Sequence, residues 1–137
     1  MTSTRPEGAT VLTDSKAFSG FSVRDVEEAR AFYADVLGVR TEVHDGGIMT
    51  LHLGGGTDVI AYPKPNHQPA GFTVLNFPVP DVDAAVRVLA GRGVVFERYD
   101  GMPQDEHGVM HDNGPTIAWF TDPSGNICSV IEVQAQD

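Results

Sequence analysis

The segment FSVRDVEEARAFYADVLGV (residues 21–39) returns later in the chain as FPVPDVDAAVRVLAGRGV (residues 77–94). Both copies hold Phe, Val, Asp, Val and Ala at corresponding positions and end in Gly-Val, although the second copy is one residue shorter. Self-similarity of this kind indicates a fold that is built by repeating one supersecondary unit. The repeat therefore decides how the rest of the sequence is divided.

Each copy predicts a strand followed by a helix. The Phe-x-Val start alternates as a strand does, and the Asp that follows it (Asp25 or Asp81) is a favoured helix N-cap. Apolar residues then recur at spacings of three and four, which is typical of a helix with one buried face. Gly38 closes the first helix, whereas Gly91 or Gly93 closes the second.

Three strands are predicted after each helix. Glycine-rich turns such as Asp45-Gly46-Gly47 separate the first set, and the strands are expected at 39–44, 48–53 and 58–63, then at 94–100, 116–122 and 127–133. The predicted fold class is α+β, with tandem βαβββ modules that form a curved mixed sheet of half-barrel cups and carry helices on the outer face. We expect a single domain over 15–137, with modules at about 16–63 and 71–134 after a flexible tail over 1–14.

The composition is that of an acidic globular chain. Its 137 residues suit one domain with one core, and its formal net charge of −10 disfavours binding to nucleic acid. No apolar run marks a signal peptide or membrane anchor, so we expect a cytoplasmic protein. The single Cys128 excludes an internal disulfide and is expected to be a buried thiol. The charge either serves solubility on a solvated face or attracts cationic ligands.

The repeat, the Val-x-Asp before each helix and the turn DPSGN (residues 122–126) together resemble the vicinal oxygen chelate superfamily. This is the group of glyoxalases, bleomycin-resistance proteins and extradiol dioxygenases, and the resemblance covers about residues 16–134. It implies a homodimer that takes a small organic molecule. It leaves the activity open, because the group includes isomerases, dioxygenases, antibiotic-modifying enzymes and proteins that sequester drugs.

The resemblance also implies where metal ligands would stand. In metal-dependent members they occupy one position on the first strand and one on the last strand of each module, which here correspond to Phe18, Ile60, Val74 and Ser129. A divalent metal needs several nitrogen, oxygen or sulfur donors, and these residues offer one hydroxyl. We therefore expect no cofactor and no metal at these positions.

A loop over 99–114 carries the remaining candidates for chemistry. His107 and His111 lie among Asp105, Glu106 and Asp112, so a metal site there stays open beside the interpretation as a solvated acidic loop, which the sequence favours. Asp105, Glu106 and His107 are weak candidates for acid–base catalysis. The loop is either a lid over the cup or a plain connection. His67, between prolines in the linker, is expected to be exposed.

Strand alternation predicts the lining of the cups once the resemblance is accepted. Ser22, Asp58 and Tyr62 face the first cup, and Phe72, Ile127 and Ile131 face the second. Trp119 is interpreted as an inward ligand wall, with ordinary core as the alternative. The ligand-binding candidates are Phe18, Ile60, Tyr62, Val74, Asn76, Trp119 and Ser129.

Two classes of function follow from these residues. The first is a metal-free protein that binds a small molecule and sequesters a cationic or aromatic compound, which the acidic charge favours. The second is a glyoxalase-like enzyme of the lyase, isomerase or dioxygenase class that acts on a small carbonyl or oxygenated metabolite. The sequence favours binding because the expected metal ligands are missing.

Overall fold

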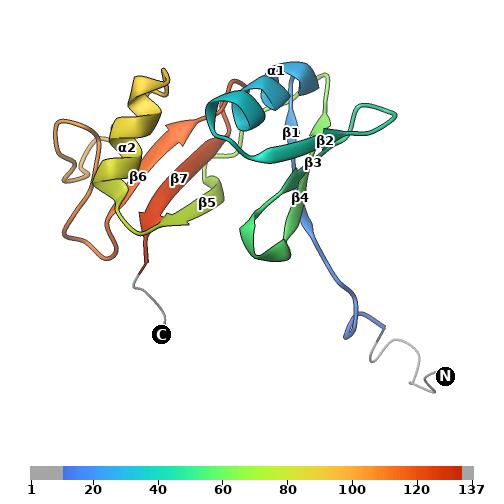
Figure 1. The fold of residues 1–137 in the computed structure, drawn as a ribbon, viewed down its shortest axis with the longest axis horizontal. Coiled ribbons are helices and arrows are strands. Elements are labelled where there is room, and N and C mark those ends of the chain that lie inside the picture. The colour runs from blue at the N-terminus through green and yellow to red at the C-terminus, as the bar shows by residue number, and fades with distance from the viewer. Residues whose placement is uncertain (1–10, 134–137) are drawn as a thin grey trace.

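The first module is a four-stranded sheet covered by one helix (Figure 1). The structure is a computed structural model that describes residues 11–133. The strand order is β1-β4-β3-β2, with β1 parallel to β4 and the other neighbours antiparallel. The elements are β1 (Ser19–Val23), α1 (Val26–Arg30), η1 (Ala31–Val36), β2 (Arg40–Val43), β3 (Met49–His52), η2 (Gly54–Gly56) and β4 (Asp58–Pro63).

The second module repeats this plan with one strand fewer. Its sheet has the order β5-β7-β6, with β5 parallel to β7 and β6 antiparallel to β7. The elements are β5 (Thr73–Val79), α2 (Val82–Gly91), β6 (Ile117–Thr121) and β7 (Ile127–Glu132). The predicted α+β fold class with curved sheets of mixed strands is confirmed, and the strands form two open sheets.

The predicted strand at 94–100 is wrong. In this segment Phe96 forms one isolated bridge with Phe120, and the Glu97 N–H donates to the Trp119 carbonyl at 2.8 Å. The Gln104 side chain then accepts from the Tyr99 N–H at 2.8 Å and donates to the Glu97 carbonyl at 2.9 Å. One side chain thus satisfies backbone groups that a further strand pairing would otherwise use.

Both helices begin at the predicted aspartates. The Asp25 carboxylate accepts from the Glu28 N–H at 2.9 Å, and Asp81 accepts from the Ala84 N–H at 3.0 Å. The first helix then widens into a π-helical turn, in which the Leu37 N–H donates to the Phe32 carbonyl at 3.0 Å. The two N-caps are local consequences of the repeat, whereas the widened turn occurs in one copy only.

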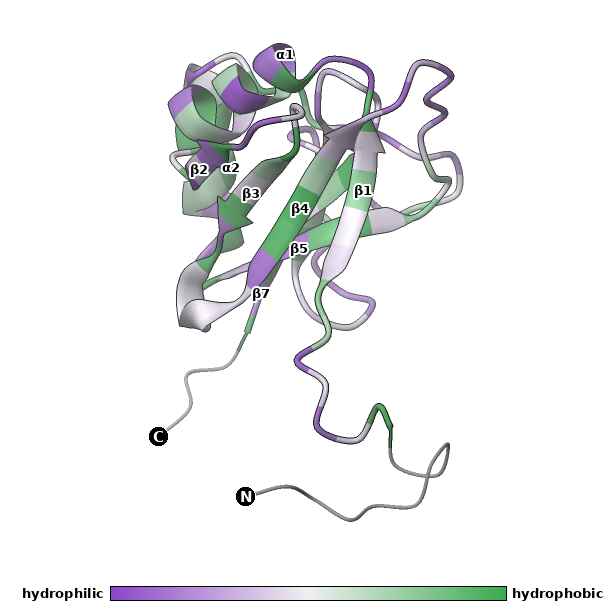
Figure 2. Cartoon of the chain, turned by 90° about the vertical axis from the view of Figure 1, so that its right-hand side faces the viewer, coloured by the Kyte–Doolittle hydropathy of each residue, from purple (hydrophilic) through white to green (hydrophobic). Residues whose placement is uncertain are grey.

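The helices and the faces of the sheets beneath them enclose the core. The first module contributes fully buried Tyr33, Met49 and Leu51, and the second contributes fully buried Phe120 and Cys128. In Figure 2, β4 and β5 carry broad hydrophobic stretches, whereas hydrophilic colour gathers on helices and loops. No helix in residues 11–133 is long and apolar enough to cross a membrane.

The turn over 122–126 joins the two modules. The buried Asp122 carboxylate accepts from the N–H groups of Ser124 and Asn126 and from the Tyr33 hydroxyl, the last at 2.7 Å. The Asn126 side chain donates to the Ser22 carbonyl at 2.9 Å. Buried polar groups need such partners, so the turn acts as a polar node within the core. Burial raises the pKa of both Tyr33 and Cys128, the thiol to about 12.

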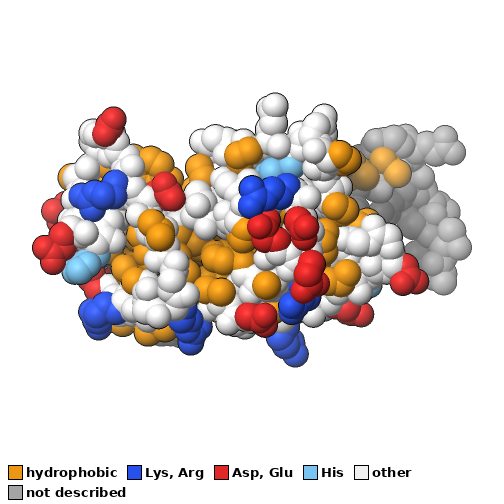
Figure 3. All heavy atoms as spheres, turned by 90° about the horizontal axis from the view of Figure 1, so that it is seen from above, with side chains coloured by type: hydrophobic (Ala, Val, Ile, Leu, Met, Phe, Trp, Pro, Cys, Tyr) orange, Lys and Arg blue, Asp and Glu red, His pale blue; other side chains and the backbone are white. Residues whose placement is uncertain are grey.

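A second junction between the modules is apolar. Seen from above (Figure 3), hydrophobic side chains gather between the two halves of the molecule. They line a groove of about 460 Å³ between α2, β5 and the end of η1, with Leu37 and Val39 on one side and Val88 and Leu89 on the other. The Arg92 guanidinium spans this groove and donates a hydrogen bond to the Val36 carbonyl at 2.9 Å.

Candidate functional site

The open face of the first sheet carries polar side chains. Met49, Leu51 and Ala61 point into the core under the helix, so the residues that alternate with them face the other way. Directly paired positions place Arg40, His52 and Asp58 in a row across β2, β3 and β4. Sequence reasoning paired Arg40 with His52 correctly and placed Asp58 on the cup, but it did not assign His52 to the cup.

His52 lies between two carboxylates on this face. Its Nδ1 is 3.0 Å from Asp58 Oδ1, and its Nε2 is 3.4 Å from Glu42 Oε1. About a third of the His52 side chain is exposed, so the ring is held in orientation and still reaches solvent. A partly exposed imidazole that is held in one orientation is suited to binding a polar group or to moving a proton.

The open face of the second sheet carries a row of uncharged side chains. Asn76 pairs with Ser129, which pairs in turn with Trp119. The Ser129 hydroxyl donates to Asn76 Oδ1 at 2.6 Å and is fully buried, while the Trp119 ring meets Tyr99 edge-on at 5.5 Å. The Asn76 amide and the Trp119 ring therefore form the surface of this row, with Ser129 beneath them.

A cleft between the modules brings parts of both faces together. It encloses about 620 Å³ and is lined by Arg40 and His52 from the first module and by Asn76 and Phe77 from the second. A volume of this size suits a small organic ligand, for which about 300–1,000 Å³ is usual. The cleft offers a cation, an imidazole and an amide beside an apolar wall, a combination suited to a ligand with both polar and apolar parts.

The other predicted ligand-binding residues do not share this cleft. Phe18 and Ile60 line a separate hollow beside Asp58, and Tyr62 is more than one-third exposed near the end of β4. Val74 is the extra residue of a β-bulge, because pairing shifts between Thr73 and Leu75. It packs against the core, so strict alternation from Asn76 back to Val74 does not hold.

The three loop candidates separate in the structure. Glu106 and His107 are largely exposed and contact each other at 3.2 Å. Asp105 turns inward, where its Oδ1 accepts from the N–H groups of His107 and Val109 and its Oδ2 lies 3.0 Å from His111 Nε2. Partial burial opposes the charged form of Asp105, but these hydrogen bonds outweigh it and lower the pKa of the carboxyl.

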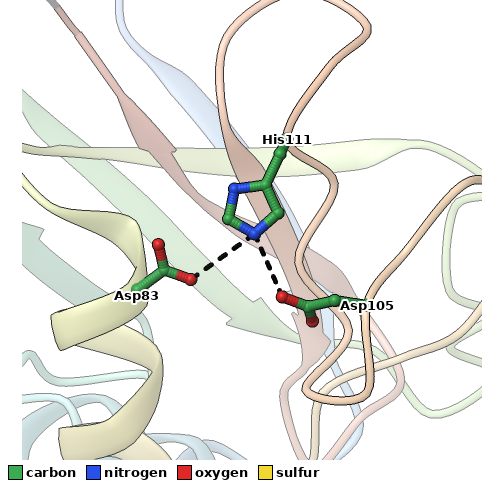
Figure 4. A group of neighbouring side chains, drawn as sticks. All are labelled: Asp83, Asp105 and His111. Atoms are coloured by element: carbon green, nitrogen blue, oxygen red, sulfur yellow. Dashed lines mark hydrogen bonds and ion pairs between the residues drawn. The ribbon is translucent and has the colours of Figure 1, made fainter.

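His111 bridges Asp105 to α2 (Figure 4). Its Nε2 is 3.6 Å from Asp83 Oδ1, and the hydrogen bond to Asp105 together with the nearby carboxylates raises the pKa of the imidazole. Among the described residues, these three form the one group of this kind with ligand atoms within 4.8 Å of one another. Two carboxylates and an imidazole are suitable donors for a divalent ion, and the group stands at the start of α2.

His67 differs from its predicted place. The ring is half-buried and joins the linker to both modules, with Nδ1 2.6 Å from Ser22 Oγ and Nε2 2.9 Å from the Ser124 carbonyl oxygen. The prolines around it predicted a solvated linker. No local pattern indicates that the linker crosses the turn over 122–126, because that path depends on how the modules pack.

Comparison with known proteins places these features among related folds. Residues 17–130 match the family model described as Glyoxalase/Bleomycin resistance protein/Dioxygenase superfamily. A solved structure of a member of that superfamily from Sphaerobacter thermophilus DSM 20745 is 26% identical, with a TM-score of 0.66 over 89% of this chain and 100% of that chain. A search of curated proteins found no match.

Two further structures show the same fold at lower identity. TnmS3, an antibiotic binding protein from Streptomyces sp. CB03234, is 23% identical, with a TM-score of 0.60 over 86% of this chain and 96% of that chain. The fosfomycin resistance protein FosX from Listeria monocytogenes is 12% identical, with a TM-score of 0.65 over 86% of this chain and 92% of that chain. At these identities the likeness concerns the fold.

Proposed function

The chain belongs to the glyoxalase/bleomycin resistance protein/dioxygenase superfamily, and on that premise we propose that it is a metal-free protein that binds a small molecule. One observation carries the proposal. The positions that correspond to the metal ligands of related proteins hold Phe18, Ile60 and Val74, which have no donor atom, and Ser129, whose buried hydroxyl already donates to Asn76. This donor set does not fit a divalent ion.

The proposed ligand is a cationic or aromatic compound that enters the cleft between the modules. Glu42 and Asp58 contact His52 in the cleft lining and outnumber the one guanidinium there, that of Arg40, and the net charge of −10 attracts cations toward the protein. On the second module, the Asn76 amide supplies a hydrogen-bonding group, and Phe77 and Pro78 supply an apolar surface. The antibiotic-binding relative with the same fold is consistent with this choice.

We further propose that two copies form a homodimer. Phe18 and Phe72 are each 68% exposed, and a second copy that covered both rings would remove their apolar area from water. Both stand at the open side of the sheets, where a second copy would shield them and narrow the cups. The cytoplasm is the proposed compartment, in keeping with the free thiol of the buried Cys128.

One observation favours a second candidate function, a glyoxalase-like enzyme that acts on a small carbonyl compound. Asp58 holds His52 by Nδ1, and Arg40 stands at the paired position on the next strand. Once a substrate displaces Glu42 from its 3.4 Å contact with Nε2, that nitrogen would take a proton from carbon next to a carbonyl group, and the Arg40 guanidinium would stabilise the resulting enolate. This chemistry uses groups of the chain alone.

Elemental analysis and ligand screening test the proposal together. We expect untagged protein to contain well under one equivalent of first-row metal and to keep its thermal midpoint in chelator. We also expect cationic aromatic compounds to raise that midpoint by a few degrees, an effect that N76A should weaken and E106A should leave unchanged. Stoichiometric metal, or no shift with any compound in the panel, would contradict the binding function.

A further inference from the structure

Ser22, His67 and Ser124 form a hydrogen-bonded chain where the two modules meet. Ser22 lies on β1, His67 on the linker after β4, and Ser124 in the turn before β7. Ser22 Oγ is 2.6 Å from His67 Nδ1, and His67 Nε2 is 2.9 Å from the Ser124 carbonyl oxygen. Both contacts are partly shielded from solvent, which strengthens them relative to a surface pair.

The chemistry of these partners fixes the direction of both hydrogen bonds. A carbonyl oxygen only accepts, so Nε2 of His67 must carry the proton and donate to Ser124. The neutral imidazole then has its lone pair on Nδ1, and the Ser22 hydroxyl must donate to it. The resting state is thus a serine hydroxyl that points its proton at a base, which a third group holds in one tautomer.

The surroundings of Ser22 leave room for a small reactant. Ser22 lines a cavity of about 290 Å³ between β1 and the start of β5, together with Phe72, Gln68 and Asn126. The Ser22 carbonyl points toward this gap, because it accepts from the Asn126 side chain at 2.9 Å. The N–H and C=O of one strand residue point to the same side, so the Ser22 N–H faces the gap as a donor.

We propose that Ser22 is an activated nucleophile and that this cavity is an acyl-transfer site for small esters. Ser22 Oγ forms a bond to the ester carbonyl carbon while its proton passes to His67 Nδ1, and the π electron pair moves onto the carbonyl oxygen near the Ser22 N–H. Collapse breaks the bond to the leaving alkoxide, which takes the proton from Nδ1.

Water completes the cycle in the same way. It gives a proton to Nδ1 as it attacks the acyl-Ser22 ester, and that proton returns to Ser22 Oγ when the carboxylic acid leaves. Ester and water are consumed, acid and alcohol are produced, and no oxidant or metal is required. This activity is independent of ligand binding in the cleft at Asn76, so each succeeds or fails separately.

The chain offers a matched control for this site. His44 Nε2 is 2.8 Å from Thr50 Oγ1, which is a second contact between an imidazole and a hydroxyl, but it is solvent-exposed. The His44 ring has a carboxylate, Glu42, at 4.0 Å, where His67 has the close Ser124 carbonyl. The variant H44Q therefore removes a histidine of similar appearance without touching the cavity.

A fluorophosphonate probe and p-nitrophenyl acetate test the proposal on the full chain. We expect the probe to label one residue, Ser22, as located by peptide mass spectrometry, and S22A to abolish both labelling and ester hydrolysis. H67Q should slow labelling by about 100-fold or more, which is the usual contribution of a general base, and H44Q should match the wild type. Unlabelled wild-type protein, label elsewhere, or an unchanged rate in H67Q would overturn the proposal.

A conservative variant separates chemistry from folding, because Ser22 and His67 also tie the modules together. S22C keeps a nucleophile at the site, and iodoacetamide should alkylate this thiol at least about 10-fold faster than the thiol of S22C/H67Q at neutral pH. Thermal unfolding shows whether each variant is folded. Equal alkylation rates in two folded variants would show that His67 does not activate this position.

Discussion

The two modules share one sequence pattern but differ in the sheets that it produces. The first has four strands and an open face of charged groups in the row Arg40, His52 and Asp58, whereas the second has three strands and an uncharged row of Asn76, Ser129 and Trp119. The helix, its cap and the core face are repeated because they determine folding. The open faces differ because side chains there make fewer packing contacts with the core. On these faces the two modules can acquire different functions.

The polar node at Asp122 has no counterpart in the first module, and its loss should have the largest effect. D122A removes the acceptor for the N–H groups of Ser124 and Asn126 and for the Tyr33 hydroxyl, all of which are buried. Leaving several buried donors unpaired should lower the free energy of unfolding by about 3–5 kcal/mol. Urea denaturation measures this loss, with the exposed-site variant D112A as the control.

A small loss in D122A would mean that water replaces the carboxylate and that the node is less central than its burial implies. Apolar contacts between the modules, such as that of Phe32 with Phe120, whose rings lie 6.1 Å apart, would then carry more of the stability. Truncation of Phe32 would distinguish these cases, because it leaves the hydrogen bonds of the node unchanged.

In the second module, Gln104 holds the segment that stands where the first module has a further strand. Its side chain accepts from the Tyr99 N–H and donates to the carbonyls of Glu97 and Gly108, at distances of 2.8 to 2.9 Å. Q104A should lower the free energy of unfolding by about 2 kcal/mol, since each hydrogen bond contributes about 0.5–1.5 kcal/mol to stability. Faster amide hydrogen exchange at Tyr99 than in the wild type would locate the effect, with Q68A as the matched control.

If Tyr99 exchange were unchanged in Q104A, backbone pairing would hold residues 94–100 and the comparison between the sheets would need revision. A strand that formed in place of the lost side chain would slow exchange further, which is the opposite of the expected result.

The helix caps test the part of the pattern that the modules share. Asp25 and Asp81 accept from the N–H group three residues on, at 2.9 and 3.0 Å. D25A and D81A should therefore each lower the free energy of unfolding by about 1 kcal/mol, and by similar amounts. Thermal or urea unfolding of both variants checks this. A loss confined to one variant would show that the two helix starts are not equivalent.

The sequence supported the repeated features better than the connections between them. Capping aspartates, alternation and turn glycines act within a few residues, so they predicted both helices, seven of the eight expected strands and the Arg40–His52 pairing. Gln104, the bulge at Val74 and the position of His67 depend on contacts between distant segments, which local periodicity does not record. For the same reason, only part of the candidate site was predicted from the sequence. Asn76 was assigned to the cup, whereas His52 and Arg40 were not.

The smallest expected effect concerns pH and the loop over 99–114 in the second module. The pKa of His111 is raised above its ordinary value of 6.5 by its hydrogen bond to Asp105 and by the carboxylates of Asp83, Asp105 and Asp112. A group whose pKa is raised on folding adds stability that is fully present below the ordinary value and is lost as pH rises through the folded value. The pKa of Asp105 is lowered below 3.8, so its contribution to stability persists until pH falls through that lower value.

The stability difference between the wild type and H111Q should therefore be largest near pH 5 and should fade above neutral pH, as measured by urea unfolding across pH. H107Q, with an exposed ring on the same loop, should show no such trend. A stability difference between wild type and H111Q that stayed constant with pH would mean that the His111 ring acts by packing alone. Charge would then not explain why this loop is held in place in the second module.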